Sequence, residues 1–240
     1  MPPGSGRAFF RGPASLRLMS TALIAGSSGL VGGFLLQQLL EAPDYDHVVA
    51  VGRRPPALTQ GKLRTVTADF AALDGVAAEL RCDDVFCCLG TTLKRAGSRE
   101  AFRAVDHAAV LALAWAARRN GARRFFLVSA LGADAHSRVF YNRVKGETEE
   151  ALAVLDFETL AIFRPSLLLG PRVEVRRGER IGAAVMWLAE PLLLGGLRKY
   201  RAIEAEVVAR AMVRCSLGRP GRGVLFFPSD EIQDMGGFGR

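Results

Sequence analysis

A glycine-rich turn near the start of the chain constrains the fold more strongly than any other feature. The sequence GSSGLVG (Gly26–Gly32) is a GxxGxxG motif that follows the apolar run at Thr21–Gly26 and opens a stretch with helical periodicity. In such a strand–turn–helix unit, Gly26 would make the tight turn, Gly29 would let the backbone approach a pyrophosphate, and Gly32 would let helix and strand pack closely. The N–H groups at the helix N-terminus would bind the phosphates. The motif therefore predicts a nucleotide site at Gly26, Ser27, Ser28, Gly29, Leu30 and Val31, with a turn made only for packing as the alternative.

Apolar runs of strand length alternate with helix-like stretches along the rest of the chain. Continuous apolar runs indicate strands that are covered on both faces, and their alternation with helices indicates βαβ units in a parallel sheet. We therefore predict an α/β fold built on a doubly wound, Rossmann-like parallel sheet. The expected strands are Thr21–Gly26, His47–Gly52, Leu63–Phe70, Asp83–Gly90, Arg123–Gly132 and Glu158–Gly170, and a long helix is expected at about Arg99–Arg119.

The chain has 240 residues, which is enough for one large domain, and no linker divides it. We expect residues 20–240 to form a single NAD(P)-binding domain, to which residues 171–240 contribute a small substrate-capping lobe. The lobe would contain a helix at Ile181–Leu194, a second helix near Glu204–Ser216 and a short strand at Gly223–Pro228.

The first nineteen residues differ in composition from the rest of the chain. They include Arg7, Arg11 and Arg17, and the first acidic residue of the chain is Glu41. Met19 immediately precedes the first expected strand, so we expect residues 1–19 to be a flexible or non-native extension. An organelle presequence is the alternative, because such segments are rich in arginine and poor in acidic residues.

The cysteines and histidines show no metal-binding pattern. Cys82, Cys87, Cys88 and Cys215 form no CxxC pair, and the three histidines have no ligand spacing with them. We therefore expect no metal, and we interpret the cysteines as buried free thiols. Free thiols fit a reducing compartment, so the cytoplasm is the expected location.

The chain carries a net charge of +8, which raises the question of nucleic-acid binding. Its 32 basic residues include only four lysines, and they are scattered along the chain and not massed on one predicted helix. We therefore expect no nucleic-acid partner.

The longest apolar segment, Ile181–Leu197, is interrupted by Glu190 and Pro191, so no membrane-spanning segment is expected. The expected partner is a small-molecule substrate, while a homodimer and a protein partner stay open.

Two arginines follow the second expected strand. Dinucleotide folds that bind NAD usually place Asp or Glu there, to accept a hydrogen bond from the ribose 2′-hydroxyl. This chain has Arg53 and Arg54, and a guanidinium can bind a 2′-phosphate through two hydrogen bonds. The cofactor is therefore predicted to be NADP(H), with two solvated arginines as the alternative.

Tyr141 and Lys145 are four residues apart in a stretch with helical character, so they share a helix face. A phenol is a poor acid or base at neutral pH, but a nearby ammonium stabilises the phenolate. Tyr141 could then give a proton to a carbonyl oxygen as hydride arrives. Ser129 stands twelve residues earlier, at the end of an expected strand, and could donate a hydrogen bond to the same oxygen.

Several of these segments together resemble the short-chain dehydrogenase/reductase superfamily. They are GSSGLVG, VFCCLGTT, FLVSALGAD, YNRVKGETE and FRPSLLLG, in that order between Thr21 and Met212. The chain is most similar to the atypical and extended branch, which holds NAD(P)-binding reductases, epimerase-like proteins and the Tat-interacting oxidoreductase-like group.

The resemblance implies a catalytic set of Ser129, Tyr141 and Lys145, with Lys145 also holding the nicotinamide ribose. Many members carry a fourth catalytic residue, an asparagine, where this chain has Asp106, and either a solvated or capping carboxylate or a functional one fits there. The further cofactor contacts that the resemblance implies are Asp69 and Phe70 near the adenine, Leu89, Gly90 and Thr91 along the central ribose, and Pro165 near the carboxamide.

The predicted function is NADPH-dependent reduction of a small carbonyl or quinone-like substrate by hydride transfer. One alternative is a non-catalytic NADP(H)-binding regulator that senses redox state and docks on another protein. A second alternative is an epimerase or dehydratase with a tightly held cofactor; such enzymes often use NAD, which Arg53 disfavours.

Overall fold

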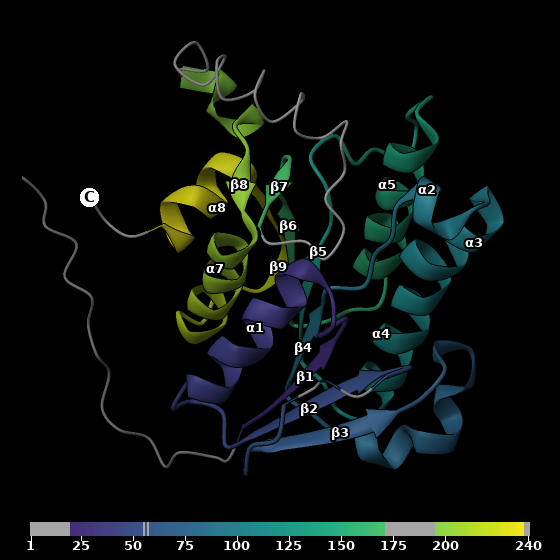
Figure 1. Ribbon diagram of the computed structural model, residues 1–240, viewed down its shortest axis with the longest axis vertical. Coiled ribbons are helices and arrows are strands. Elements are labelled where there is room, and N and C mark those ends of the chain that lie inside the picture. The colour runs from purple at the N-terminus through teal and green to yellow at the C-terminus, as the bar shows by residue number, and fades with distance from the viewer. Residues whose placement is uncertain (1–19, 55, 57, 171–194, 238–240) are drawn as a thin grey trace, which may run out of the picture.

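A computed structural model describes residues 20–54, 56, 58–170 and 195–237 of the chain (Figure 1). Its core is a seven-stranded sheet with the order β3-β2-β1-β4-β5-β6-β9, and every neighbouring pair is parallel. The predicted doubly wound α/β fold is therefore confirmed. The strands are β1 (Thr21–Ala25), β2 (His47–Gly52), β3 (Leu63–Thr67), β4 (Asp84–Cys87), β5 (Arg124–Val128), β6 (Thr159–Arg164) and β9 (Gly223–Pro228).

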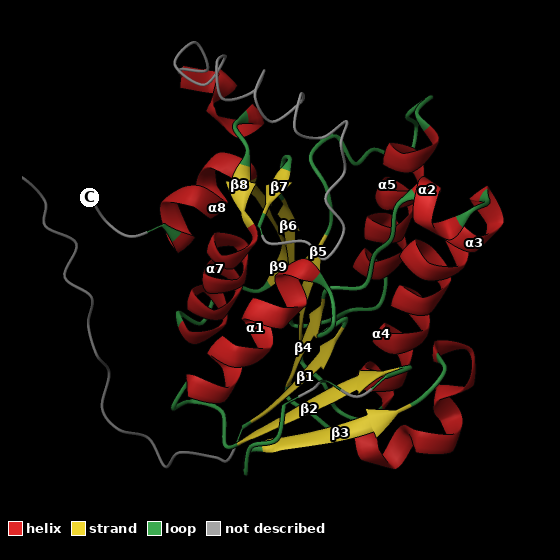
Figure 2. Ribbon diagram, in the orientation of Figure 1, coloured by secondary structure: helices red, strands yellow, loops and turns green. Residues whose placement is uncertain are grey.

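Helices cover both faces of the sheet (Figure 2). On one face, α1 (Leu30–Glu41) packs beside α7 (Ala205–Leu217), and α8 (Ser229–Gly236) packs against α7. On the other face lie α4 (Ala109–Arg119) and α5 (Phe140–Ala153), together with the 3-10 segment η1 (Phe70–Leu80), which packs against α4.

Alternating side chains of the central strands feed two apolar layers, one on each face of the sheet. Ile24 of β1 and Phe86 of β4 point into the layer beneath α1 and α7, whereas Leu23 and Val85 point into the layer beneath α4 and α5. All four side chains are fully buried, and each contributes about 1.5–3 kcal/mol by leaving water. These continuous buried runs confirm that the strands are covered on both faces.

The long helix expected at Arg99–Arg119 is divided. It begins as α3 (Arg99–Arg103), which follows the short α2 (Leu93–Ala96), then widens into a π-helical turn, η2 (Ala104–Ala108), and continues as α4. π-helical turns inside α-helices are uncommon and are frequently found at functional sites. This one carries Asp106.

The described part of the C-terminal region mainly completes the large domain. β9 pairs with β6 as an edge strand, and α7 and α8 join one helical layer. A second, two-stranded sheet of β7 (Leu168–Leu169) and β8 (Ile203–Glu204) lies near the 3-10 segment η4 (Gly195–Tyr200) (Figure 1). The helix expected at Ile181–Leu194 and the extension at 1–19 lie outside the described residues.

A buried polar cluster ties the strands together at the amino-terminal edge of the sheet. Asp84 of β4 accepts a hydrogen bond from the Tyr45 hydroxyl and two from the Arg124 guanidinium, whose Nε lies 2.6 Å from Asp84 Oδ1. Arg124 also donates to the Ser216 carbonyl of α7 at 2.8 Å. Burial, with Asp84 next in importance, raises the pKa of Tyr45 far above its usual value, so this phenol stays protonated.

Candidate active site

The glycine turn lies between the ends of two neighbouring strands, β1 and β4. Gly26 has a φ of +86°, and a Cβ there would stand 2.5 Å from the carbonyl oxygen of Cys88. A Cβ on Gly32 would stand 2.1 Å from the Gly26 carbonyl oxygen. Real Cβ atoms do not come closer than about 3 Å to such atoms, so both positions require glycine. The tight turn and the close packing of helix on strand are therefore present.

The N-terminus of α1 has the properties of an anion site. Gly29 is its N-cap residue, and no side-chain hydrogen bond caps the helix in the part of the chain that the structure describes. Ser28 and Gly29 are exposed, so the first N–H groups of the helix, from Leu30 onward, can reach an incoming phosphate. The residues therefore fit a dinucleotide pyrophosphate, and its binding there stays a prediction.

Two of the predicted contact regions for the adenosine end follow β2 and β3. Arg53 and Arg54 are exposed in the bend after β2, at the carboxyl edge of the sheet. Asp69 caps η1, and its Oδ1 accepts from the Ala71 N–H at 3.0 Å, while Phe70 is buried. The Asp69 carboxylate thus has a structural partner, and its contact with adenine stays a prediction.

The loop that follows β4 rests on two charged side chains. The Thr91 N–H donates to Asp106 Oδ2 at 2.8 Å. A Cβ on Gly90 would lie 3.4 Å from Asp106 Oδ1 and 3.6 Å from Lys145 Nζ. The loop predicted to line the central ribose, Leu89–Thr91, is therefore bonded to Asp106 and passes close to the predicted catalytic lysine.

Tyr141 and Lys145 occupy successive turns at the start of α5. The Lys145 ammonium lies 2.7 Å from Asp106 Oδ1, and the two side chains are 7% and 0% exposed. Burial lowers the pKa of Lys145, but the charge of Asp106, with a smaller effect of Tyr141, outweighs it and raises that pKa above its usual value. Of the two interpretations of Asp106, the solvated one is wrong, since this carboxylate is buried and ion-paired.

The Tyr141 side chain is only half buried, and its ring packs against Phe102 with centroids 5.5 Å apart. Tyr141 is among the groups that raise the pKa of Lys145, which indicates that the phenol lies near the ammonium. The structure therefore brings this predicted pair together on one helix face, with the phenol on the solvent side of the lysine.

Ser129 has a hydrogen-bond partner within the protein. Its hydroxyl donates to the Glu149 carboxylate, which also accepts two hydrogen bonds from Arg164, and both Ser129 and Glu149 are buried. Glu149 stands eight residues after Tyr141, about 12 Å further along the helix axis. The Ser129 hydrogen is thus already donated to a carboxylate of the protein, and its role toward a substrate stays a prediction.

Sequence reasoning did not find Glu149 and Arg164 as partners in this network. A signal was available, because Tyr141, Lys145 and Glu149 recur at intervals of four residues and so share one face of α5. Pro165 is buried at the end of β6, where its carbonyl accepts from the Leu131 N–H at 2.8 Å. This places Pro165 at the carboxyl edge of the sheet, as expected.

The loop after β5 lies directly on the backbone of α5. A Cβ on Gly146 would stand 2.1 Å from the Ala135 nitrogen and 2.2 Å from the Asp134 carbonyl carbon. The Asp134 N–H also donates to the Asn142 carbonyl at 3.1 Å. Gly146, next to Lys145, therefore allows this loop to approach the helix that carries the proposed proton donor.

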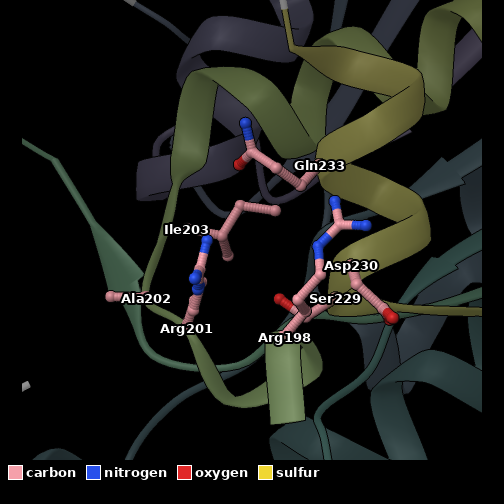
Figure 3. Close-up of a pocket in the computed structure, with 7 residues that line it drawn as sticks. All are labelled: Arg198, Arg201, Ala202, Ile203, Ser229, Asp230 and Gln233. Atoms are coloured by element: carbon pink, nitrogen blue, oxygen red, sulfur yellow. The ribbon is translucent and has the colours of Figure 1, made fainter. Parts of the chain in front are cut away.

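A small cavity of about 40 Å³ lies between η4, β8 and α8 (Figure 3). This volume holds only a few water molecules, so the cavity is too small for a dinucleotide. Tyr141, Lys145 and Ser129 are not among its lining residues, which are Arg198, Arg201, Ala202, Ile203, Ser229, Asp230 and Gln233.

The four cysteines are free, and Cys82, Cys87 and Cys215 are buried. Burial raises the pKa of Cys87 and of Cys215 to about 12.

Within the described residues, no cluster of three or more His, Cys, Asp or Glu side chains could hold a metal ion. No helix among those residues is long and apolar enough to cross a membrane.

Comparison with known proteins gives matches over most of the chain. A protein-family model described as NAD(P)H-binding matches residues 26–157, from the glycine turn to just beyond α5. Protein HTATIP2 of Rattus norvegicus is 36% identical over 210 residues, which cover 85% of this chain and 83% of that protein. Protein FMP52, mitochondrial, of Coccidioides immitis is 35% identical over 216 residues, covering 83% of this chain and 86% of that protein.

Solved structures share the fold at low sequence identity. UDP-glucose 4-epimerase of Thermotoga maritima, solved with UDP-glucose, has a TM-score of 0.65 and 16% identity, covering 92% of this chain and 84% of its own. MoeE5 in complex with UDP-glucose and NAD has a TM-score of 0.64 and 17% identity, covering 89% of this chain and 80% of its own. At these identities, the likeness shows a common architecture.

Proposed function

The chain belongs to the NAD(P)H-binding family of Rossmann-type, short-chain dehydrogenase/reductase-like proteins, and on that premise we propose that it is an NADPH-dependent oxidoreductase that reduces a small carbonyl or quinone-like substrate. The single observation that carries the proposal is the Lys145 ammonium. It is buried at 2.7 Å from Asp106, close to the Leu89–Thr91 loop, and one helical turn from the half-buried Tyr141.

In the proposed reaction, bound NADPH would supply the hydride for the substrate carbonyl carbon. Tyr141 would give its hydroxyl proton to the carbonyl oxygen, and the Lys145 ammonium would stabilise the phenolate that remains. Tyr141 suits this task because it is only partly buried, which leaves part of the side chain accessible to a substrate. The glycine turn and the uncapped start of α1 would hold the pyrophosphate.

The preference for NADPH over NADH rests on Arg53 and Arg54. Both are exposed at the end of β2, the position at which dinucleotide-binding folds of this type usually bind the adenosine ribose. The sequence GRRPP has no acidic residue beside these two arginines. The position therefore favours the 2′-phosphate of NADPH over the free ribose hydroxyls of NADH.

A screen of NADPH oxidation with aldehydes, ketones and quinones tests the proposal, with Tyr141→Phe as the matched control. We expect turnover with at least one class and its loss by at least about 100-fold in the variant, since general acid catalysis contributes that much or more. The Kd for NADPH, measured by calorimetry, should stay within about twofold of the unmodified protein, because phenylalanine keeps the ring that packs on Phe102. Equal turnover by both proteins would refute the role of Tyr141.

A second candidate is a non-catalytic NADP(H)-binding regulator. The observation that favours it is the hydrogen bond from Ser129 to the buried Glu149, which leaves the Ser129 hydroxyl without a hydrogen for a substrate carbonyl. Tight NADPH binding together with no NADPH oxidation across the whole substrate panel would select this candidate. Turnover that depends on Tyr141 would eliminate it.

For the compartment, we propose the cytoplasm, with import directed by residues 1–19 as the alternative. The names of the fungal relatives include the word mitochondrial, which favours the alternative. Fluorescent fusions of the full chain and of residues 20–240, imaged in a eukaryotic cell, distinguish the two. A mitochondrial signal from the full chain alone would establish the import signal.

A further inference from the structure

Asp106 is an unusual residue because it combines complete burial with a position in a π-helical turn. η2 is wider than the α-helix on either side of it, and Asp106 is its only buried residue. A buried carboxylate is costly unless it is paired and hydrogen-bonded. The contacts of Asp106 therefore indicate why an acidic side chain occupies this place.

Both carboxylate oxygens of Asp106 face the proposed site, and each has its own partner. Oδ1 lies 2.7 Å from the Lys145 ammonium on α5, and Oδ2 accepts from the Thr91 N–H at 2.8 Å, in the loop after β4. The backbone of Asp106 is held as well, since its carbonyl accepts from the Thr148 hydroxyl at 3.0 Å. One residue thus connects three elements that meet at the carboxyl edge of the sheet.

We propose that Asp106 is a positioning residue for the reaction proposed above: its carboxylate holds the Lys145 ammonium in place and fastens the Leu89–Thr91 loop against it. Lys145 and the loop are the two features expected to hold the cofactor riboses, so Asp106 would fix them relative to each other before the cofactor arrives. This inference rests on the proposed function only where it concerns turnover. The ion pair with Lys145 and the hydrogen bond to the loop are present in the protein without cofactor.

The charge balance around Lys145 supports this role. The groups that raise the pKa of its ammonium are Asp106 from η2, Tyr141 from its own helix and the Cys87 thiol from β4. Burial alone lowers the pKa of Lys145, and Asp106 is the largest influence that raises it. Without that carboxylate, the buried lysine would lose its proton at a lower pH, and the charge that stabilises a phenolate would be lost with it.

Two substitutions separate the charge of Asp106 from its hydrogen bond. Asp106→Asn removes the negative charge but keeps an oxygen that can accept from the Thr91 N–H, whereas Asp106→Ala removes both. If the carboxylate served only to fill space, the isosteric asparagine would behave like the original residue.

The titration of Lys145 provides a readout that does not depend on activity. The chain has only four lysines, so carbon-13 labelling at lysine Cε gives a simple NMR spectrum, in which the Lys145→Met variant identifies the Lys145 signal. We expect the signal of the unmodified protein not to titrate below pH 10.5, the ordinary value for lysine. In Asp106→Asn, the midpoint should fall by at least about one pH unit.

A midpoint below 10.5 in the unmodified protein would overturn the inference even if the variants fail to fold. Midpoints in the unmodified protein and Asp106→Asn that agree within about 0.3 units would overturn it as well.

The loop contact is tested by NADPH affinity, where Asp106→Ala should weaken binding at least about threefold more than Asp106→Asn, and equal Kd values would refute that half. If NADPH does not bind the unmodified protein, the proposed function fails while the lysine titration still decides the role of Asp106.

Discussion

Two adjacent glycines at the start of α1 should respond in opposite ways to the same substitution. Gly32 and Gly33 both lie inside the helix, where alanine is favoured over glycine by about 1 kcal/mol. A Cβ on Gly33 would meet the Ser27 carbonyl oxygen at 3.7 Å, an ordinary contact. A Cβ on Gly32 would stand only 2.1 Å from the Gly26 carbonyl oxygen, so α1 would have to move away from the turn by about 1 Å.

The expected magnitudes follow from these contacts. Gly33→Ala should raise the free energy of unfolding by up to about 1 kcal/mol, because nothing opposes the gain in helix propensity. Gly32→Ala should lower it by about 2–3 kcal/mol, because overpacking against a fixed backbone atom exceeds that gain. The same movement would carry the helix N-terminus away from the phosphate position, so the NADPH Kd should rise at least about tenfold in Gly32→Ala only.

Urea denaturation followed by circular dichroism measures the stability of both variants, and calorimetry measures NADPH binding. Gly33→Ala is a matched control, since it adds the same methyl group one residue further along the same helix. Equal stabilities and equal NADPH affinities for the two variants would show that the close approach of α1 to Gly26 is not required.

Three further results are expected. Arg53→Ala combined with Arg54→Ala should raise the NADPH Kd about tenfold and leave the NADH Kd within about twofold, and a parallel loss for both cofactors would argue against 2′-phosphate binding. Asp84→Asn should lower the free energy of unfolding by about 3 kcal/mol, because it breaks a buried ion pair, whereas Glu158→Gln at an exposed pair should change it by less than about 0.5 kcal/mol. The Cys87 thiol, with a pKa raised by burial to about 12, should resist alkylation at pH 8 in the folded protein, and rapid labelling of the native protein would contradict its burial. Because this folded pKa lies above the ordinary 9.0, the contribution of Cys87 to the free energy of unfolding should be lost as the pH rises above 9.

Local patterns in the sequence determined most of the architecture. The apolar runs predicted the central strands correctly, because a strand that is covered on both faces is apolar along its whole length. The third strand was predicted to continue to Phe70 but ends at Thr67, since Asp69 caps the helical segment that follows. Its side-chain hydrogen bond to Ala71 explains an early end that hydrophobicity alone does not reveal.

The remaining differences come from contacts between residues that are distant in the sequence. The partner of Asp106 is Lys145, which lies on another helix, so composition and spacing could not distinguish a solvated carboxylate from a buried one. The hydrogen bond from Ser129 to Glu149 was likewise not predicted, because the two residues are twenty positions apart and lie on different elements. Burial of a charged group is decided by packing, which a single sequence does not contain.

The contact between Gly146 and the loop after β5 has a consequence for how this scaffold can change its substrate. With no side chain between them, α5 lies directly on the loop at Asp134 and Ala135, and a larger group at position 146 would push the helix and the loop apart. In the proposed reaction, room for a bulkier substrate would therefore have to come from another side, so that Tyr141 and Lys145 keep their positions. Such a division would let substrate range diversify while the chemistry is inherited unchanged.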